Sequence, residues 1–308
     1  MRAVVAFCVF ALVASAFAMP SSYKRTETYE GHKVFRCHFP KRADSDALYD
    51  LVHAFGLDVW THRVNGEIDV RLTPAQQSSV FLSTFFGEKC EVHIKDVEEH
   101  VVQAEMQWAA VPKNAEWFED YHTYDEIVLW YSQRPAAYPT LATYIPSIGR
   151  SYEGRNQPAL HITSSRGVNK PKIYFQCQIH AREHISGAVC NYVVNHLLNG
   201  YGNDTQITNL LDSIEYIVVP FVNPDGYVHT WSGDRLWRKN RQPNSGSTCI
   251  GTDVNRNYNS HWGQGGSSAL PCSVSPFSFS FPKTNKNKIK QKQTKKQKQK
   301  TKNNRIEL

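Results

Sequence analysis

A histidine and a glutamate stand three residues apart in His180-Ala-Arg-Glu183, where a strand-like run gives way to a helical pattern. At such a turn both side chains can point at one cation, and nitrogen plus oxygen ligands suit zinc with a water in an open position. The same pattern also occurs on ordinary surface turns. The motif therefore indicates zinc chemistry only if residues elsewhere support it.

Arginines follow this motif in a pattern that suits recognition of a carboxylate. Arginine offers a permanent charge and a bidentate fork, and Asn255-Arg256 places two planar donors side by side for one anion. A second arginine, aimed where negative charge develops, would act mainly in the transition state, where one lost donor costs about 3 to 4 kcal/mol. Taken singly, Arg235, Arg238 and Arg241 fit a solvated basic surface better.

The motifs together resemble the zinc metallocarboxypeptidases of the pancreatic carboxypeptidase A/B type, which are secreted as zymogens. The motifs stand in the family's order and include Asn223-Pro-Asp-Gly-Tyr227 and Asp253-Val-Asn-Arg-Asn257, as well as residues 148–155 and 235–241. The resemblance covers the signal, the propeptide, Lys113 as the activation site, and the first half of the catalytic domain up to Cys272.

The resemblance implies a role for each matched position. It implies His180 and Glu183 as two of three ligands of a Zn²⁺ cofactor, and Arg182 as an outer substrate-binding residue. It implies Arg238 as the catalytic cation that polarises the scissile carbonyl and stabilises the oxyanion. For Arg238 alone, we therefore prefer a catalytic role to a place on a solvated basic surface. It also implies that the substrate's free carboxylate is clamped by Asn255 and Arg256.

Residues 33–95 have the pattern of a complete small domain: strand, apolar helical stripe, two strands around Asn65-Gly66, helix and strand. The second helix opens at Thr73-Pro74, an N-cap followed by proline, and extends to about residue 86. The order β-α-β-β-α-β predicts a ferredoxin-like α+β sandwich as the propeptide, residues 19–113. Its first and last strands are neighbours, so Cys37 could meet Cys90.

Residues 114–272 have the pattern of an incomplete α/β catalytic domain, a mixed sheet flanked by helices. Thr123-x-x-Glu126 is a capping box for a helix that ends before Pro135. Strand-like runs at 159–163 and 172–179 alternate with a helical stripe. Residues 214–222 are nearly all apolar, as in a strand buried on both faces.

The N-terminus and the cysteines indicate secretion. Arg2, an apolar run and Ala16-Phe-Ala18 form the layout of a signal peptide, residues 1–18. The run is far short of the ~20 residues that span a bilayer. Removing it leaves six cysteines in an oxidising compartment, enough for three disulfides. The resemblance pairs Cys249 with Cys272, and Cys177 with Cys190 as in B-type members.

After Cys272 the sequence leaves the family pattern and enters a tail, residues 273–308, rich in Lys, Gln and Asn, which we expect to be disordered. The family's third zinc-binding histidine and its general-base glutamate lie downstream of this point, and His261 is the last histidine here. A catalytic zinc normally needs three protein ligands plus water. We therefore expect residual zinc affinity at most and no peptidase turnover.

The charge of the chain argues against a nucleic-acid partner. The formal net charge is +7, but residues 283–308 alone carry +10, so residues 19–282 carry −4 once Arg2 is also set aside. Polyanion binding by the tail would weaken steeply with increasing salt concentration, but the tail has no aromatic residue after Phe281 and no expected fold.

Two functions therefore compete. The first is a secreted, extracellular carboxypeptidase precursor that acts on peptide and protein C-termini. Lys113 is the only Lys or Arg between Asp96 and Gln133, so a trypsin-like protease would activate it there. The second is a non-catalytic protein whose propeptide domain binds or inhibits carboxypeptidases. We expect a monomer without a membrane partner, and the preference for basic or hydrophobic C-terminal residues stays open.

Overall fold

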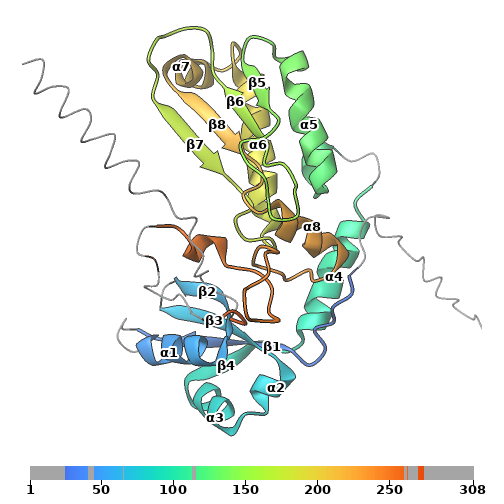
Figure 1. Cartoon of the computed structure of the whole chain (residues 1–308), viewed down its shortest axis with the longest axis vertical. Helices are drawn as coiled ribbons and strands as arrows, with labels where there is room; N and C mark the ends of the chain where they lie inside the picture. The colour runs from blue at the N-terminus through green and yellow to red at the C-terminus, as the bar shows by residue number, and fades with distance from the viewer. Residues whose placement is uncertain are drawn as a thin grey trace, which may run out of the picture.

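The computed structural model describes residues 25–40, 45–64, 66–112, 116–259, 262 and 270–273. The expected signal peptide, Lys113 and nearly all of the tail lie outside these ranges. Within them, every helix is too short or too polar to cross a membrane. Two four-stranded sheets lie toward opposite ends of the long axis (Figure 1). We call residues 25–112 the first unit and residues 116–273 the second unit.

The first unit has one antiparallel sheet in the order β2-β3-β1-β4. Its elements are β1 (Lys33–His38), α1 (Asp46–Phe55), β2 (Asp58–Val64), β3 (Glu67–Leu72), α2 (Pro74–Gln77), α3 (Val80–Lys89), β4 (Cys90–Ile94) and α4 (Val97–Ala109).

The core of the first unit lies between this sheet and its helices. Leu48 and Val52 of α1 and Phe86 of α3 pack with the buried strand residues Ile68 and Val70. Cys37 of β1 lies opposite Cys90 of β4, and a disulfide joins the two, which confirms the expected bridge.

Three helices differ from the sequence-based expectation. The single helix expected from Pro74 to residue 86 is two helices, because Ser79 is extended and its hydroxyl caps α3 at the backbone N–H of Leu82. The helix expected to end before Pro135 continues to Ala137, so that Pro135 lies in its last turn. The helix α4 was not expected from the sequence, although Asp96 caps it at the N–H of Glu99.

The second unit has a mixed sheet in the order β5-β6-β8-β7, in which β7 runs parallel to β8 and the other pairs are antiparallel. Helices flank this sheet, as expected (Figure 1). Its elements are η2 (Trp117–Glu119), α5 (Tyr124–Ala137), β5 (Ala142–Ile145), β6 (Ala159–Ile162), β7 (Lys172–Gln176), α6 (His184–Gly200), α7 (Thr205–Ser213), β8 (Glu215–Val219), α8 (Pro224–Ser232) and η3 (Val254–Arg256).

Two strands of this sheet are shorter than the sequence predicts. The apolar run at 214–222 forms a strand only to Val219, because Pro220 has no N–H for the ladder, and only Val218 and Val219 of β8 are fully buried. The run expected to reach residue 179 leaves the sheet after Gln176. The chain turns there, and this turn carries the candidate metal ligands.

The start of the first unit is in direct contact with the chain that follows α8 of the second unit. The backbone N–H groups of Thr26 and Glu27 both donate to the carbonyl of Gly233. The Tyr29 hydroxyl donates to Asp234 at 2.6 Å, and burial, followed by that carboxylate, raises the pKa of Tyr29. At the other end of the first unit, the ring of Trp108 lies 4.5 Å from that of Trp231. The first unit is therefore held at both of its ends.

Candidate active site

The turn between β7 and α6 has a fixed, unusual backbone. Gln178 adopts a positive φ of 54° and is fully buried, a conformation that non-glycine residues seldom adopt. Its side-chain amide donates to the carbonyl of His184, and its N–H donates to the hydroxyl of Ser186. A Cβ on Gly187 would lie 2.7 Å from this amide, so a larger residue there would displace the Gln178 side chain. These contacts hold residues 179–183 in a tight loop.

His180 and Glu183 come together in this loop, as the sequence predicts. Nδ1 of His180 lies 2.9 Å from Oε1 of Glu183. The other ring nitrogen, Nε2, lies 3.2 Å from Oδ1 of Asp253, a carboxylate with no exposed surface. Metal-binding histidines usually place their second nitrogen on such a carboxylate, which fixes the ring and raises its basicity.

The two carboxylates control the charge of His180. Burial alone would lower the pKa of His180, but hydrogen bonds with Asp253 and Glu183 outweigh burial and raise it. Burial alone would raise the pKa of Asp253, but the His180 hydrogen bond and the Arg238 charge hold it far below its usual range. The charges therefore stabilise one another, with His180 and Asp253 buried and the Glu183 carboxylate partly exposed to solvent.

The donor atoms fit zinc as part of a site. A cation held by Nδ1 of His180 and Oε1 of Glu183 would replace the proton that these atoms share, while the contact between Nε2 and Asp253 would remain. The described part of the chain contains no group of three His, Cys, Asp or Glu side chains placed to hold a metal ion. The residues present therefore supply two ligands and one supporting carboxylate.

Arg238 belongs to the same cluster, as predicted. Its side chain is 7% exposed, and Nε donates to Oδ2 of Asp253 at 3.0 Å. Nη1 lies 3.8 Å from Oε1 of Glu183, so the far end of the guanidinium faces the candidate metal ligand. The Arg238 carbonyl also accepts from the N–H of Ala181, which ties it to the metal loop.

Asn255 and Arg256 lie on η3, directly after Asp253. The carboxylate of Asp253 caps this short helix by accepting from the N–H of Asn255 at 2.9 Å. Among the described residues, no carboxylate forms an ion pair with Arg256, and its buried Nε has no hydrogen-bond partner. Arg256 is close enough to Asp253 to help lower the pKa of that carboxyl. A positive charge is thus available beside the cluster for an anion.

Arg182 differs from the other predicted residues, because its guanidinium is paired with a carboxylate of the first unit. Its two Nη atoms donate to the two oxygens of Asp58 at 2.8 and 2.9 Å. Asp58 is 5% exposed and also pairs with Arg71 of its own unit. Burial alone would raise the pKa of Asp58, but the charges of Arg182 and Arg71 hold it well below its usual range.

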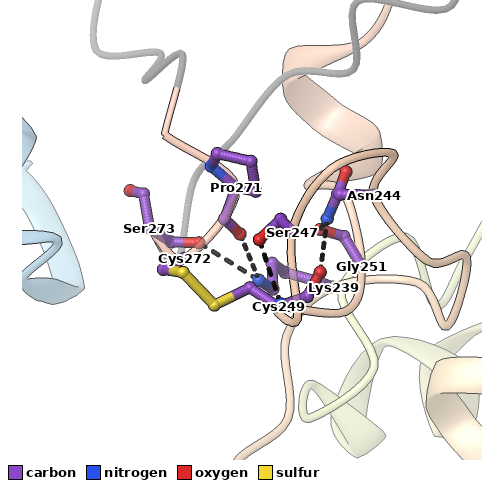
Figure 2. Close-up of a disulfide and its surroundings, with 8 residues drawn as sticks. All are labelled: Lys239, Asn244, Ser247, Cys249, Gly251, Pro271, Cys272 and Ser273. Atoms are coloured by element: carbon purple, nitrogen blue, oxygen red, sulfur yellow. Dashed lines mark hydrogen bonds between the residues drawn. A yellow bond between two sulfur atoms is a disulfide. The ribbon is translucent and has the colours of Figure 1, made fainter.

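A disulfide and a buried lysine fix the chain after Arg238 (Figure 2). Cys249 pairs with Cys272, and the ammonium of Lys239 donates to the carbonyls of Pro271 and Ser273. Burial lowers the pKa of Lys239 to about 8. The Cys177–Cys190 bridge is also present and joins the chain after β7 to α6. Both pairings that the resemblance implies are confirmed.

Two residues of this arrangement were not predicted from the sequence. Asp253 stood inside a recognised motif, and its place two residues before Asn255 was a usable signal. No local signal marks Asp58, because its partner lies 124 residues away. The expected activation site Lys113 lies outside the described residues.

The chain is similar in sequence to known proteins over most of its length. A family model described as zinc carboxypeptidase matches residues 127–307, a range that continues past Cys272. Metallocarboxypeptidase A of Trichophyton tonsurans is 34% identical over 279 residues, which is 89% of this chain and 64% of that protein. Carboxypeptidase B of Bos taurus is 31% identical over 269 residues, with 85% and 64% covered. The chain thus spans less than two thirds of either relative.

A solved structure extends the likeness to the fold. The carboxypeptidase A from Helicoverpa armigera superposes with a TM-score of 0.74 and 28% identity, and the match covers 83% of this chain and 65% of that one. The family match covers more than half of the residues, so the chain is a member of the zinc carboxypeptidase family.

Proposed function

We propose that this chain is the precursor of a secreted, extracellular zinc metallocarboxypeptidase, a hydrolase for the C-terminal residues of peptides. The observation that carries the proposal is the cluster of Glu183 with the buried residues His180, Arg238 and Asp253, beside Arg256, which forms no ion pair among the described residues. It combines two metal ligands, a cation for a developing oxyanion and a receptor for a carboxylate.

Each residue of the cluster has a distinct task in this proposal. Zinc, when bound, would supply a Lewis acid and a water of lowered pKa. His180 and Glu183 would hold the metal, and Asp253 would orient the imidazole. Arg238, fixed through Nε, would donate to the substrate carbonyl as negative charge develops. Arg256, with Asn255, would bind the free C-terminal carboxylate.

We infer further that residues 19–113 are a propeptide that covers the site until a trypsin-like protease cuts at Lys113. The chain order β-α-β-β-α-β and the antiparallel order β2-β3-β1-β4 support a ferredoxin-like fold for it. The Asp58 carboxylate fills the fork of Arg182, so a substrate carboxylate or carbonyl would have to displace it.

For the chain itself we propose weak zinc binding and no peptidase turnover. Two metal ligands are in place, whereas a catalytic zinc normally takes three from the protein. A general base contributes about 10² to 10⁴ in rate. We assign this role to none of the residues that the structure describes.

The test combines zinc binding with hydrolysis. The secreted chain is treated with trypsin, supplied with zinc and assayed on a blocked C-terminal dipeptide, beside the double variant His180→Ala, Glu183→Ala. We expect equilibrium dialysis to show zinc binding that the double variant lacks, and hydrolysis no faster than that of the variant. Substantial turnover would contradict the proposed inactivity, whereas equal zinc binding by both proteins would contradict the site.

A second function has one specific observation in its favour. The first unit has its own core and disulfide, and it presents Asp58 to an arginine of a carboxypeptidase fold. The unit released by trypsin would then inhibit active members of the family. Titrating such an enzyme with the wild-type unit and with Asp58→Asn tests this, since only the wild-type unit should inhibit strongly.

A further inference from the structure

The turn between α6 and α7 carries the only Asn-x-Ser/Thr sequence among the 308 residues, Asn203-Asp-Thr205. Such sequences accept N-linked glycans when they are exposed in a secreted protein. None of the tasks assigned above uses this turn. Asn203, Asp204 and Thr205 are all exposed.

The geometry of this turn leaves the Asn203 amide open to modification. Gly202 has a φ of +82° and turns the chain outward. The side-chain nitrogen of Asn203 donates to the carbonyl of Asn199 at 2.9 Å. A carboxamide nitrogen has two hydrogens, so one can be replaced by a sugar while the other keeps this bond.

The neighbouring residues are compatible with a folded, glycosylated turn. The carboxylate of Asp204 caps α7 by accepting from the N–H groups of Gln206 and Ile207. Thr205 is the first helical residue and is exposed, so its hydroxyl is not needed for the cap. The cap and the sequon therefore use different groups of the same three residues.

The position of the turn also suits a bulky substituent. α7 lies at the end of the second unit that is farthest from the first unit (Figure 1). The contacts between the units and the cluster around His180 lie at the opposite end of the second sheet. A glycan at Asn203 would therefore obstruct neither the site nor the docking of the first unit.

We propose that Asn203 is an N-glycosylation site, an inference that rests on the proposed secretion of the chain. The donor is a polyprenyl diphosphate oligosaccharide. The side-chain nitrogen of Asn203 forms a bond to C1 of the first sugar and loses one proton to a base of the transferase. The bond between C1 and the diphosphate oxygen breaks, and the polyprenyl diphosphate leaves with the electron pair.

The test is translation of the full chain with endoplasmic-reticulum microsomes, followed by protease protection and treatment with an N-glycosidase. We expect a protected, signal-cleaved product that carries one glycan, and conversion of Asn203 to Asp by the glycosidase. Asn203→Gln and Thr205→Ala should lose the glycan completely. The matched variant Thr205→Ser should keep it, because serine retains the hydroxyl of the sequon.

Two results would overturn the inference, and they separate it from the proposed function. A protected, signal-cleaved chain with an unmodified Asn203 would contradict glycosylation at this site and would agree with the proposed secretion. A chain that is unprotected, with its signal uncut, would contradict both the glycosylation and the secretion. A glycan that persists in Thr205→Ala would place the modification elsewhere and also contradict the proposal.

Discussion

Asp253 connects three parts of the candidate site at the scale of single residues. One oxygen lies against Nε2 of His180 and accepts from the N–H of Asn255, and the other accepts from Nε of Arg238. The metal ligand, the oxyanion donor and the carboxylate clamp therefore share one buried carboxylate. Its loss should affect all three.

We predict that Asp253→Asn weakens zinc binding about 10- to 100-fold, the usual effect of removing such a supporting carboxylate. Asparagine keeps the shape but loses the charge that holds the His180 ring and Arg238. Competition with a zinc chelator dye measures the change. Asp225→Asn is a suitable control, since Asp225 is equally buried but binds the loop of Ser151 and Arg155. Equal loss in both variants would mean general destabilisation.

The two metal ligands could be predicted because they are close in sequence, whereas their surroundings could not. A separation of three residues at a strand-to-helix turn forces His180 and Glu183 together. Asp253 reaches His180 from 73 residues away, and this contact depends on where the chain after Arg238 passes. The positive φ of Gln178 shapes the metal loop. It could not be predicted, because the residue is neither a glycine nor an asparagine.

At the scale of elements, the Cys177–Cys190 bridge ties the end of β7 to the second turn of α6, across the metal loop. We predict that replacing both cysteines by serine lowers the free energy of unfolding of the second unit by about 3 kcal/mol, because the bridge closes a short loop of the unfolded chain. Zinc affinity should fall as well. Denaturant unfolding, followed by tryptophan fluorescence, measures the first effect.

The control for this prediction is the Cys37–Cys90 bridge of the first unit. Its removal should destabilise that unit and leave zinc affinity unchanged. A zinc affinity that is insensitive to the loss of Cys177–Cys190 would show that hydrogen bonds alone hold the loop, such as that from Ala181 to the Arg238 carbonyl.

The starts of helices were predicted from the sequence more accurately than their ends. Capping residues located the starts of helices well, since Thr123 and Thr73 cap as predicted. The ends depended on tertiary contacts or on a second cap, so the helix after Pro74 broke at Ser79 and α5 continued through Pro135. The strand order of the second sheet, with β7 at an edge, is a long-range property.

At the scale of the whole molecule, the paired charges of Asp58 and Arg182 join the two units. We predict that Asp58→Asn weakens retention of the first unit by on the order of 10²- to 10³-fold, since breaking a buried ion pair costs about 3 to 5 kcal/mol. The measurement is the fraction of first unit that co-elutes with the second unit after trypsin. Asp69→Asn, which breaks an Arg36 pair inside the first unit, should leave retention unchanged.

The same contact has a predictable pH dependence. The pKa of Asp58 in the docked state is depressed, so its ionised form stabilises docking above the usual Asp pKa of about 3.9. That stabilisation is lost only as the pH falls through the lower, docked value. Retention of the first unit should therefore be constant between pH 8 and about pH 5. A loss in that range would show that another group controls docking.

None of the three disulfides spans residue 113. Cys37–Cys90 closes entirely before residue 113, while Cys177–Cys190 and Cys249–Cys272 close entirely after it. A cut at Lys113 would leave two pieces without any covalent link, so a unimolecular contact would become a bimolecular equilibrium. The high effective concentration that the tether provides would vanish. Dilution into a larger volume, rather than the cut alone, would then separate the pieces.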